Sequence, residues 1–290
     1  MKVLTFADLH LRSTVPSCID CTLTEWMKVQ KDALDKVVSI ALEQNVNEVY
    51  VGGDIFHSEQ STSFECIILF QEFVNKLHIN GIPVYIMAGN HDLPQHSSLN
   101  INFSAIGVLF NSNNVLLMQD SKTIKGCNFD VDEFGDSKYI FKHILCMPEN
   151  EKPDIVDCDT PKTLLDKYPN AEIIFTGDYH RKFAFTENGR FVINSGCLTK
   201  QASDFEDYET GVFVTDLNSK EVIWCSVNIP QKFVKNHAIK KIDNSIDDFI
   251  NSLNKTSSTL DFINVLRNKL DAQDSSVKDK VESWIEEIGQ

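Results

Sequence analysis

The stretch VYIMAGNHD, residues 84–92, carries the pattern that decides the fold. Four large apolar or aromatic residues lead into two small residues and then into Asn90, His91 and Asp92. A short apolar run ended by glycine is typical of a buried strand. In open α/β sheets, functional side chains collect beyond the carboxyl ends of such strands. We therefore predict a strand over 84–87 whose end contributes to a site.

Two earlier strands and two helices surround this stretch. The predicted elements are strands over residues 2–7, 46–51 and 84–87 and helices over 23–44 and 63–79. In both helical segments the apolar residues recur at spacings of three and four. Alternation of strands and helices in this order predicts a layered α/β core.

Polar side chains that bind metals follow the other strands as well. Asp8 and His10 follow the first strand, Asp54 follows the second, and Asp178 and His180 follow the apolar run 173–176. In an extended backbone, residues two apart lie on one face, so Asp8 and His10 are expected to grip one ion together. Carboxylates and imidazoles that converge in this way suit divalent metals.

Glycines precede two of these candidate ligands. Gly53 stands before Asp54 and Gly89 stands before Asn90. Glycine permits tight turns and close backbone approach. We expect both glycines to aim the next side chain into the site.

The second half of the chain contains short apolar runs with few helices between them. These runs cover residues 115–118, 139–146, 172–176, 190–194, 211–216 and 221–227. Because long crossover helices are scarce, antiparallel pairing is expected. Asn188-Gly189 is a hairpin turn signal.

The composition changes near Asn236. We assign residues 1–235 to the main domain and 236–290 to a small appended unit with charged helical patterns. Residues 276–288 carry an apolar stripe on an otherwise charged helix, which either packs on the protein's own core or docks a partner.

Charge and length restrict the function. The chain has 290 residues and a formal net charge of −15, which weighs against a free-standing DNA binder. Bound cations or a basic partner subunit would offset this charge. No apolar run reaches 18 residues and no signal-peptide pattern begins the chain, so a cytoplasmic protein without membrane contact is expected.

The order Asp8-x-His10, Gly52-Gly53-Asp54, Gly89-Asn90-His91-Asp92, then His143, then Gly177-x-x-His180 resembles the calcineurin-like metallophosphoesterase family. The resemblance covers roughly residues 1–235. It implies an α/β (α+β) fold: a two-sheet β-sandwich flanked by helices, with two divalent metal ions.

A narrower resemblance points to one branch of this family. The stretch Gly52–His57 is similar to the corresponding motif of SbcD-type DNA-repair nucleases. Asn194–Leu198, followed by Gly211–Phe213, also resembles that branch.

The resemblance also implies a role for each candidate residue. Asp8, His10 and His180 hold one metal, Asn90 and His143 hold the other, and Asp54 bridges them. His91 acts on the leaving oxygen, and Asp92 orients His91. For His143, an ordinary polar residue at a strand end is the alternative interpretation.

Asp178 departs from the family pattern, which usually has histidine there. Its carboxylate could bind the second metal and favour Mn²⁺, or Mg²⁺, over softer ions. The alternative is that Asp178 binds no metal and the second site is weak.

Taken together, the leading hypothesis is a metal-dependent DNA nuclease subunit, exonuclease or endonuclease, that works in DNA repair, recombination or replication. The resemblance implies an SbcC-type coiled-coil ATPase as partner and is compatible with a homodimer. Two alternatives stay open. One is a phosphomonoesterase, or a cyclic-nucleotide or phosphoprotein phosphatase. The other is a non-catalytic scaffold with a degenerate metal site.

Overall fold

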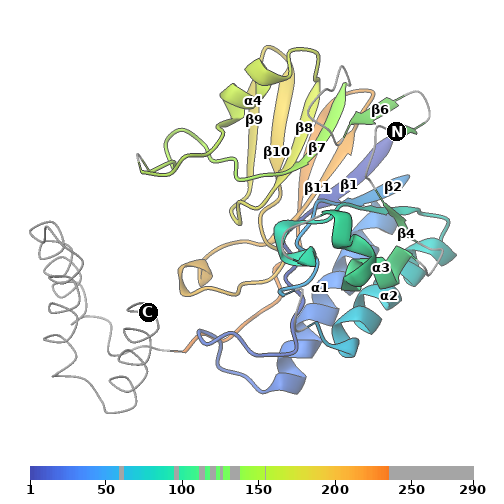
Figure 1. Ribbon diagram of the computed structural model, residues 1–290, viewed down its shortest axis with the longest axis vertical. Helices are drawn as coiled ribbons and strands as arrows, with labels where there is room; N and C mark the ends of the chain where they lie inside the picture. Colours follow the sequence, from blue (N-terminus) through green and yellow to red (C-terminus); the bar gives the residue numbers. More distant parts are fainter. Residues whose placement is uncertain are drawn as a thin grey trace, which may run out of the picture. The chain divides into compact units, whose positions relative to one another are not determined.

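The computed structural model describes residues 1–58, 62–94, 98–110, 115–117, 122–124, 127–130, 138–153 and 155–234. Within these ranges the fold is mixed α/β, with two six-stranded sheets and flanking helices (Figure 1). The predicted two-sheet sandwich flanked by helices is confirmed. The appended unit predicted over 236–290 lies outside the described residues.

The first sheet has the spatial order β12 (Glu221–Ser226), β11 (Gly211–Asp216), β1 (Lys2–Phe6), β2 (Glu48–Val51), β3 (Val84–Ile86) and β4 (Val115–Leu117). The second has the order β5 (Lys122–Ile124), β6 (Cys127–Asp130), β7 (Tyr139–His143), β8 (Ile173–Gly177), β10 (Arg190–Asn194) and β9 (Phe183–Glu187). The helices are α1 (Leu23–Glu43), α2 (Phe64–Ile79), α3 (Ala105–Phe110) and α4 (Pro161–Lys167), with short 3-10 turns η1 (Asn90–Asp92), η3 (Ser98–Phe103) and η4 (Ser203–Phe205).

Helices α1 and α2 begin at side-chain caps. The Thr22 hydroxyl accepts from the Glu25 backbone N–H, and the Glu25 carboxylate accepts from the Thr22 N–H, which forms a capping box. Ser63 caps α2 in the same way through the N–H of Cys66. Apolar faces of both helices join the core beside β1, β2 and β3, so the predicted elements form where the periodicity indicated.

Aromatic rings fill the space between the two sheets. Tyr50 stacks on Tyr85 and on Phe141, with ring centroids 4.8 Å apart in both pairs. Phe141 stacks in turn on Phe175 at 4.5 Å. Because these rings come from β2, β3, β7 and β8, one buried stack joins the two sheets.

The prediction of antiparallel pairing in the second half was correct for β11 and β12 but wrong for four other strands. β4 pairs parallel with β3. β7, β8 and β10 are parallel neighbours. Helix α4 supplies a crossover between β7 and β8 that the sequence interpretation missed, and β9 lies between β8 and β10 in the chain. The hairpin at Asn188-Gly189 is confirmed, since both residues have positive φ and join antiparallel β9 and β10.

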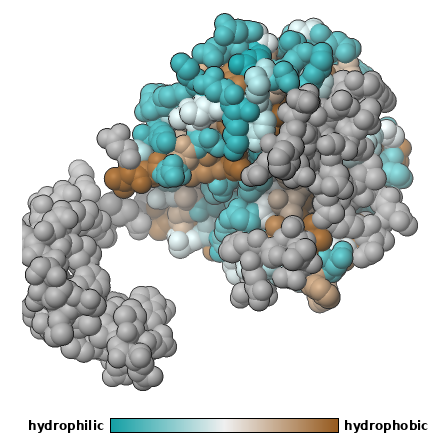
Figure 2. Space-filling view, turned by 45° about the horizontal axis from the view of Figure 1, so that its top comes forward, coloured by the Kyte–Doolittle hydropathy of each residue, from teal (hydrophilic) through white to brown (hydrophobic). Residues whose placement is uncertain are grey.

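The described part of the chain contains no helix with the length and apolar character needed to cross a membrane. Hydrophilic residues cover much of the described surface in Figure 2, and a band of hydrophobic residues crosses it.

Candidate metal centre

The carboxyl ends of parallel strands from both sheets meet at one edge of the sandwich. β1, β2 and β3 run parallel in one sheet, as do β7, β8 and β10 in the other. The buried hydroxyl of Ser195, after β10, accepts a 3.0 Å hydrogen bond from the N–H of Ala7, after β1. Side chains that follow these strands are therefore brought together although they lie far apart in sequence.

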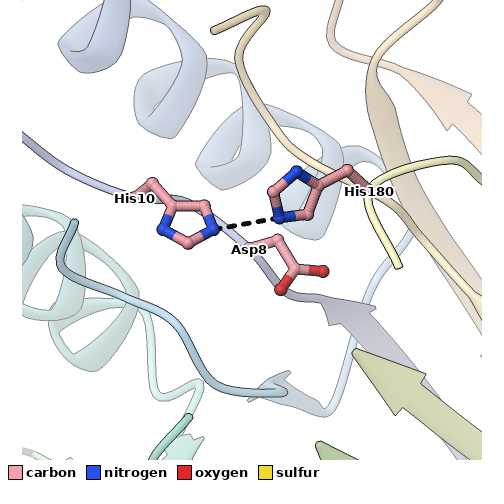
Figure 3. A group of neighbouring side chains, drawn as sticks. All are labelled: Asp8, His10 and His180. Atoms are coloured by element: carbon pink, nitrogen blue, oxygen red, sulfur yellow. Dashed lines mark hydrogen bonds between the residues drawn. The ribbon is translucent and has the colours of Figure 1, made fainter. Parts of the chain in front are cut away.

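Six of the predicted site residues gather at this edge. Three overlapping groups have ligand atoms within 4.8 Å of one another: Asp8, His10 and His180; His10, Asp54 and His91; and Asp8, Asp54 and His143. Figure 3 shows Asp8, His10 and His180 arranged around a common space. Asp178 belongs to none of these groups in the described ranges.

Left-handed backbone, not a pleated strand, aims the first ligands. β1 ends at Phe6, and Asp8 and His10 have φ of 54° and 46°. Asp54 and Asp178 also have positive φ, at 51° and 81°. The expectation that Asp8 and His10 share a face of an extended strand was wrong. Such φ values are uncommon outside glycine and are associated with functional sites.

The glycines before Asp54 and Asn90 allow the close approach that the sequence predicted. Gly53 has φ of 100°, in the left-handed region. A Cβ on Gly89 would lie 2.0 Å from Oδ1 of Asp54. Any side chain at Gly89 would therefore displace this carboxylate.

The Asp54 carboxylate faces two sets of ligands. Its Oδ2 lies 3.6 Å from Nε2 of His10, and its Oδ1 lies 3.4 Å from Nε2 of His143. Oδ1 also accepts a 2.9 Å hydrogen bond from the N–H of His91. Oδ2 is buried and has no hydrogen-bond partner among the described residues. A buried oxygen without a donor is costly, and a cation would satisfy it.

On the first side of Asp54, two imidazoles face each other. The Nε2 atoms of His10 and His180 lie 3.1 Å apart (Figure 3). Burial lowers the pKa of His10 to about 3, and it also lowers the pKa of His180. Neutral imidazole is the form that binds metals. Two nitrogens on one octahedral ion, at about 2.1 Å each, would be about 3 Å apart, so this pair fits a shared cation.

On the second side, the backbone fixes the orientation of His143. Its Nδ1 lies 2.8 Å from the carbonyl oxygen of Gly52, and its Nε2 lies 3.1 Å from Oδ1 of Asn90. If Nδ1 donates to that carbonyl, Nε2 is free to bind a metal. Burial opposes a charge on His143, but the hydrogen bond to Asp54 and the charges of Asp8 and Asp54 outweigh it and raise its pKa to about 10. A bound cation would replace that proton.

The two carboxylates next to these imidazoles, Asp8 and Asp54, have pKa values shifted in opposite directions. Burial raises the pKa of Asp8 to about 7. Burial acts in the same direction on Asp54, but hydrogen bonding and charge from His143 and the charge of His10 hold its pKa below the usual value. The Asp54 carboxylate is thus ionised at neutral pH, which is the form that binds a metal ion.

The prediction that Asp92 orients His91 requires correction. Both Asp92 oxygens accept backbone N–H groups, from Ile55, Phe56 and Gly89, at 2.9–3.1 Å. The His91 ring instead has its Nδ1 2.9 Å from the carbonyl oxygen of His57. Burial raises the pKa of Asp92 to about 6, and those backbone donors oppose the rise. Asp92 therefore ties the loop after β2 to η1 and positions backbone rather than the His91 ring.

Asn194 and Gly196 hold the loop that carries His180. The Asn194 amide donates to the carbonyl oxygens of Tyr179 and Arg181, and the Cys197 N–H donates to that of His180. Gly196 has φ of 67°, and a Cβ there would lie 2.5 Å from the His180 carbonyl oxygen. The turn after β10 therefore supports the ligand loop through its backbone.

A cavity of about 190 Å³ opens beside the candidate metal ligands. Its lining includes His10, Arg12, His57, His91, His180, Cys197, Thr199, Gln201, Ala202 and Phe205. The sequence interpretation missed Arg12, Gln201 and Phe205 as members of this site. For Arg12 the sequence did offer an indication, because this residue stands only two positions after the candidate ligand His10.

Comparison with known proteins agrees with this geometry. Residues 1–182 match the family described as calcineurin-like phosphoesterase. The DNA double-strand break repair protein Mre11 of Nanoarchaeum equitans (strain Kin4-M) is 36% identical over 86 residues, which are 30% of this chain and 22% of that protein.

Two solved structures are similar in part. One comes from work on the structure and function of a novel archaeal phosphodiesterase; it has a TM-score of 0.44 at 15% identity and covers 78% of this chain and 99% of that one. The other is Vps29 with Zn²⁺ from Entamoeba histolytica, with a TM-score of 0.39 at 10% identity, covering 79% of this chain and 100% of that one. The family match extends over more than half of the chain and includes the ends of β1, β2, β3, β7 and β8. The chain belongs to the calcineurin-like phosphoesterase family.

Proposed function

We propose that this phosphoesterase is a DNA nuclease that uses two divalent cations, Mn²⁺ by preference and Mg²⁺ as the alternative. The observation that carries the two-metal assignment is the Asp54 carboxylate, whose two oxygens face different imidazoles. Membership of the family supports hydrolysis of a phosphoester.

In this proposal, Asp8, His10 and His180 hold the first cation, and Asn90 and His143 hold the second. Asp54 would be shared between them, since its two oxygens face His10 and His143. The Asp8 carboxylate also approaches the second group, because its ligand atom lies within 4.8 Å of those of Asp54 and His143. Asp178 contributes its backbone N–H, which donates to both oxygens of Asp8 at 3.0 and 3.1 Å.

When bound, two divalent cations would supply charge to polarise the phosphoryl oxygens and to lower the pKa of a water molecule. The protein's own contribution to bond cleavage is assigned to His91. The His57 carbonyl oxygen can only accept a hydrogen bond, so Nδ1 of His91, 2.9 Å away, donates to it. His91 lines the cavity, and we assign to its Nε2 the transfer of a proton to the leaving oxygen.

DNA as substrate is supported by similarity and by motif. The matched relative is named as a DNA double-strand break repair protein. The Gly52–His57 stretch, which resembles SbcD-type nucleases, encloses Asp54. The net charge of −15 favours an assembly in which a partner contributes DNA affinity. We propose an SbcC-type ATPase as that partner, homodimerisation of the nuclease, and a cytoplasmic role in DNA repair, recombination or replication.

A nuclease assay tests the proposal directly. Purified protein, stripped of metal and then supplied with Mn²⁺ or Mg²⁺, is incubated with blunt, overhanging and hairpin DNA and, in parallel, with p-nitrophenyl phosphate. We expect DNA cleavage that disappears in excess chelator and returns with Mn²⁺. Hydrolysis of the aryl phosphate without DNA cleavage would favour a phosphomonoesterase instead. Fewer than two ions per chain by mass spectrometry, with no activity, would favour a scaffold.

The appended unit over 236–290 is proposed to dock the partner through the stripe on 276–288. Deleting residues 272–290 should leave metal content unchanged and abolish co-purification with the ATPase. A fall of several degrees in melting temperature would instead place the stripe in the protein's own core.

A further inference from the structure

Arg12 stands at the cavity beside the metal centre, and its backbone is held rigidly. The Arg12 N–H donates to Oε1 of Gln30 at 2.9 Å. Its carbonyl oxygen accepts from Nε2 of Gln30 at 2.9 Å and from Nε1 of Trp26 at 3.2 Å. Gln30 and Trp26 are both fully buried on α1. The base of the Arg12 side chain is therefore fixed relative to the core.

The guanidinium of Arg12 uses only one of its nitrogen atoms in a hydrogen bond within the described ranges. Its Nε donates to the Thr14 hydroxyl at 2.8 Å, and its Nη groups have no hydrogen bond or ion pair within the described ranges. The other two arginines of those ranges differ. Arg181 donates through Nη2 to the Asp204 carboxylate, and Arg190 donates through Nη1 to three carbonyl oxygens. Nη groups without an acceptor among the described residues are unexpected in a chain with a net charge of −15.

The position of Arg12 suits an anion that reaches the metal centre. Arg12 lines the same cavity as His10, His91 and His180. Burial lowers the pKa of His57, and the positive charge of Arg12 lowers it further. The cavity wall formed by these two residues is therefore electropositive. The planar guanidinium binds phosphate through two parallel hydrogen bonds.

We propose that Arg12 binds a phosphate next to the scissile one and so selects a polynucleotide over an isolated phosphoester. The inference rests on the proposed nuclease function and adds a specificity-determining residue to it. The cations neutralise the scissile phosphate, and Arg12 meets the neighbouring phosphate of the same strand.

The test compares Arg12→Gln with the unmodified full-length protein on two diesters. One is a single-stranded oligodeoxynucleotide, and the other is bis(p-nitrophenyl) phosphate, which has no neighbouring phosphate. We expect the ratio of kcat/KM for the oligonucleotide to that for the small diester to fall about tenfold or more. We also expect the dependence of log kcat/KM on log salt for the oligonucleotide to become shallower by about 0.7, as for one lost phosphate contact.

Two further variants serve as controls. Arg12→Lys keeps the charge but loses the fork, so it should restore part of the ratio and most of the salt slope. Lys28→Gln removes one positive charge from an exposed lysine of α1 that pairs with Asp32, and it should leave the ratio within about twofold of the unmodified protein.

The remaining outcomes overturn the inference in distinguishable ways. Equal losses on both diesters would make Arg12 a structural residue or a contact of the scissile phosphate. An unchanged ratio and salt slope would remove Arg12 from substrate binding while the nuclease function stands. Hydrolysis of the small diester without cleavage of any oligonucleotide by the unmodified protein would refute the nuclease function and this inference together.

Discussion

The two sides of the Asp54 carboxylate are built by different means. His143 is the last residue of β7, and a backbone carbonyl lies against its ring. His10 and His180 lie beyond the ends of β1 and β8, and the Nδ1 of His10 has no hydrogen-bond partner among the described residues. The second side is thus pre-organised by a strand, whereas the first depends on loops that Asn194 supports. Four predictions test this difference between the two sides.

Removing the bridge should have the largest effect. Asp54→Asn keeps the shape of the side chain but removes the charge shared by both sides. We expect the variant to lose both cations. Its kcat should fall by more than about a thousandfold, which is more than the loss of a single hydrogen-bond donor to the transition state causes. Metal content by mass spectrometry and turnover on DNA measure this. Retention of two ions per chain would show that Asp54 does not bridge them.

Removing one imidazole from each side should separate the two cations. His180→Ala and His143→Ala should each bind about one ion per chain, with affinity for the missing ion lowered at least about a hundredfold, since even the loss of supporting partners costs up to that amount. Calorimetric titration with Mn²⁺ measures both affinities. If either variant loses both ions equally, the two sides act as one unit and the comparison fails.

His91→Ala should impair the chemistry and spare both cations. We expect turnover to fall about a hundredfold, as for loss of a general acid, with two ions still bound. His78→Ala is the matched control, because His78 is exposed on the last turn of α2. His91 also lies close to His10 and Asp54, so it could itself be a metal ligand. Loss of a metal ion in His91→Ala would show this and would contradict the role in chemistry.

Asp178 should give the smallest effect, if its conformation is preserved. Asp178→Gly removes the carboxylate and tolerates φ of 81°. Asp178→Ala removes the same carboxylate but adds about 1–2 kcal/mol of strain in the left-handed region. We expect the glycine variant to keep two ions, with affinity lowered less than about tenfold, and the alanine variant to bind more weakly. Loss of one ion in the glycine variant would show that the Asp178 carboxylate binds a cation.

Local sequence signals predicted part of the structure well. The ranges predicted for α1 and α2 from the apolar spacing are each within one residue of the observed bounds, and in the structure Thr22 and Ser63 cap the first turns. The hairpin at Asn188-Gly189 follows equally from two residues that adopt positive φ. Each of these features depends on neighbours within a few residues, so the pattern is complete in the chain itself.

Pairing between distant strands could not be predicted in the same way. The parallel pairing of β7 with β8 depends on the crossover through α4, which has only seven residues, and the parallel pairing of β8 with β10 depends on the excursion through β9. The conformation of Asp8 and His10 was also mistaken. Both have left-handed φ, and their N–H groups donate to the carbonyls of Gly53 and Asp54. These contacts join residues far apart in the sequence, so local patterns do not reveal them.

By itself, the sequence determined which residue types stand at the ends of which strands, and hence the ligand candidates from Asp8 to His180. The tertiary structure alone decided which oxygen of Asp54 faces His10 and which faces His143. It also turned Asp92 away from His91 and placed Arg12 at the cavity, with no acceptor for its Nη groups among the described residues. The reason is physical: strand ends and caps arise from local backbone preferences, whereas hydrogen-bond partners, burial and cavities arise only when two sheets close on each other.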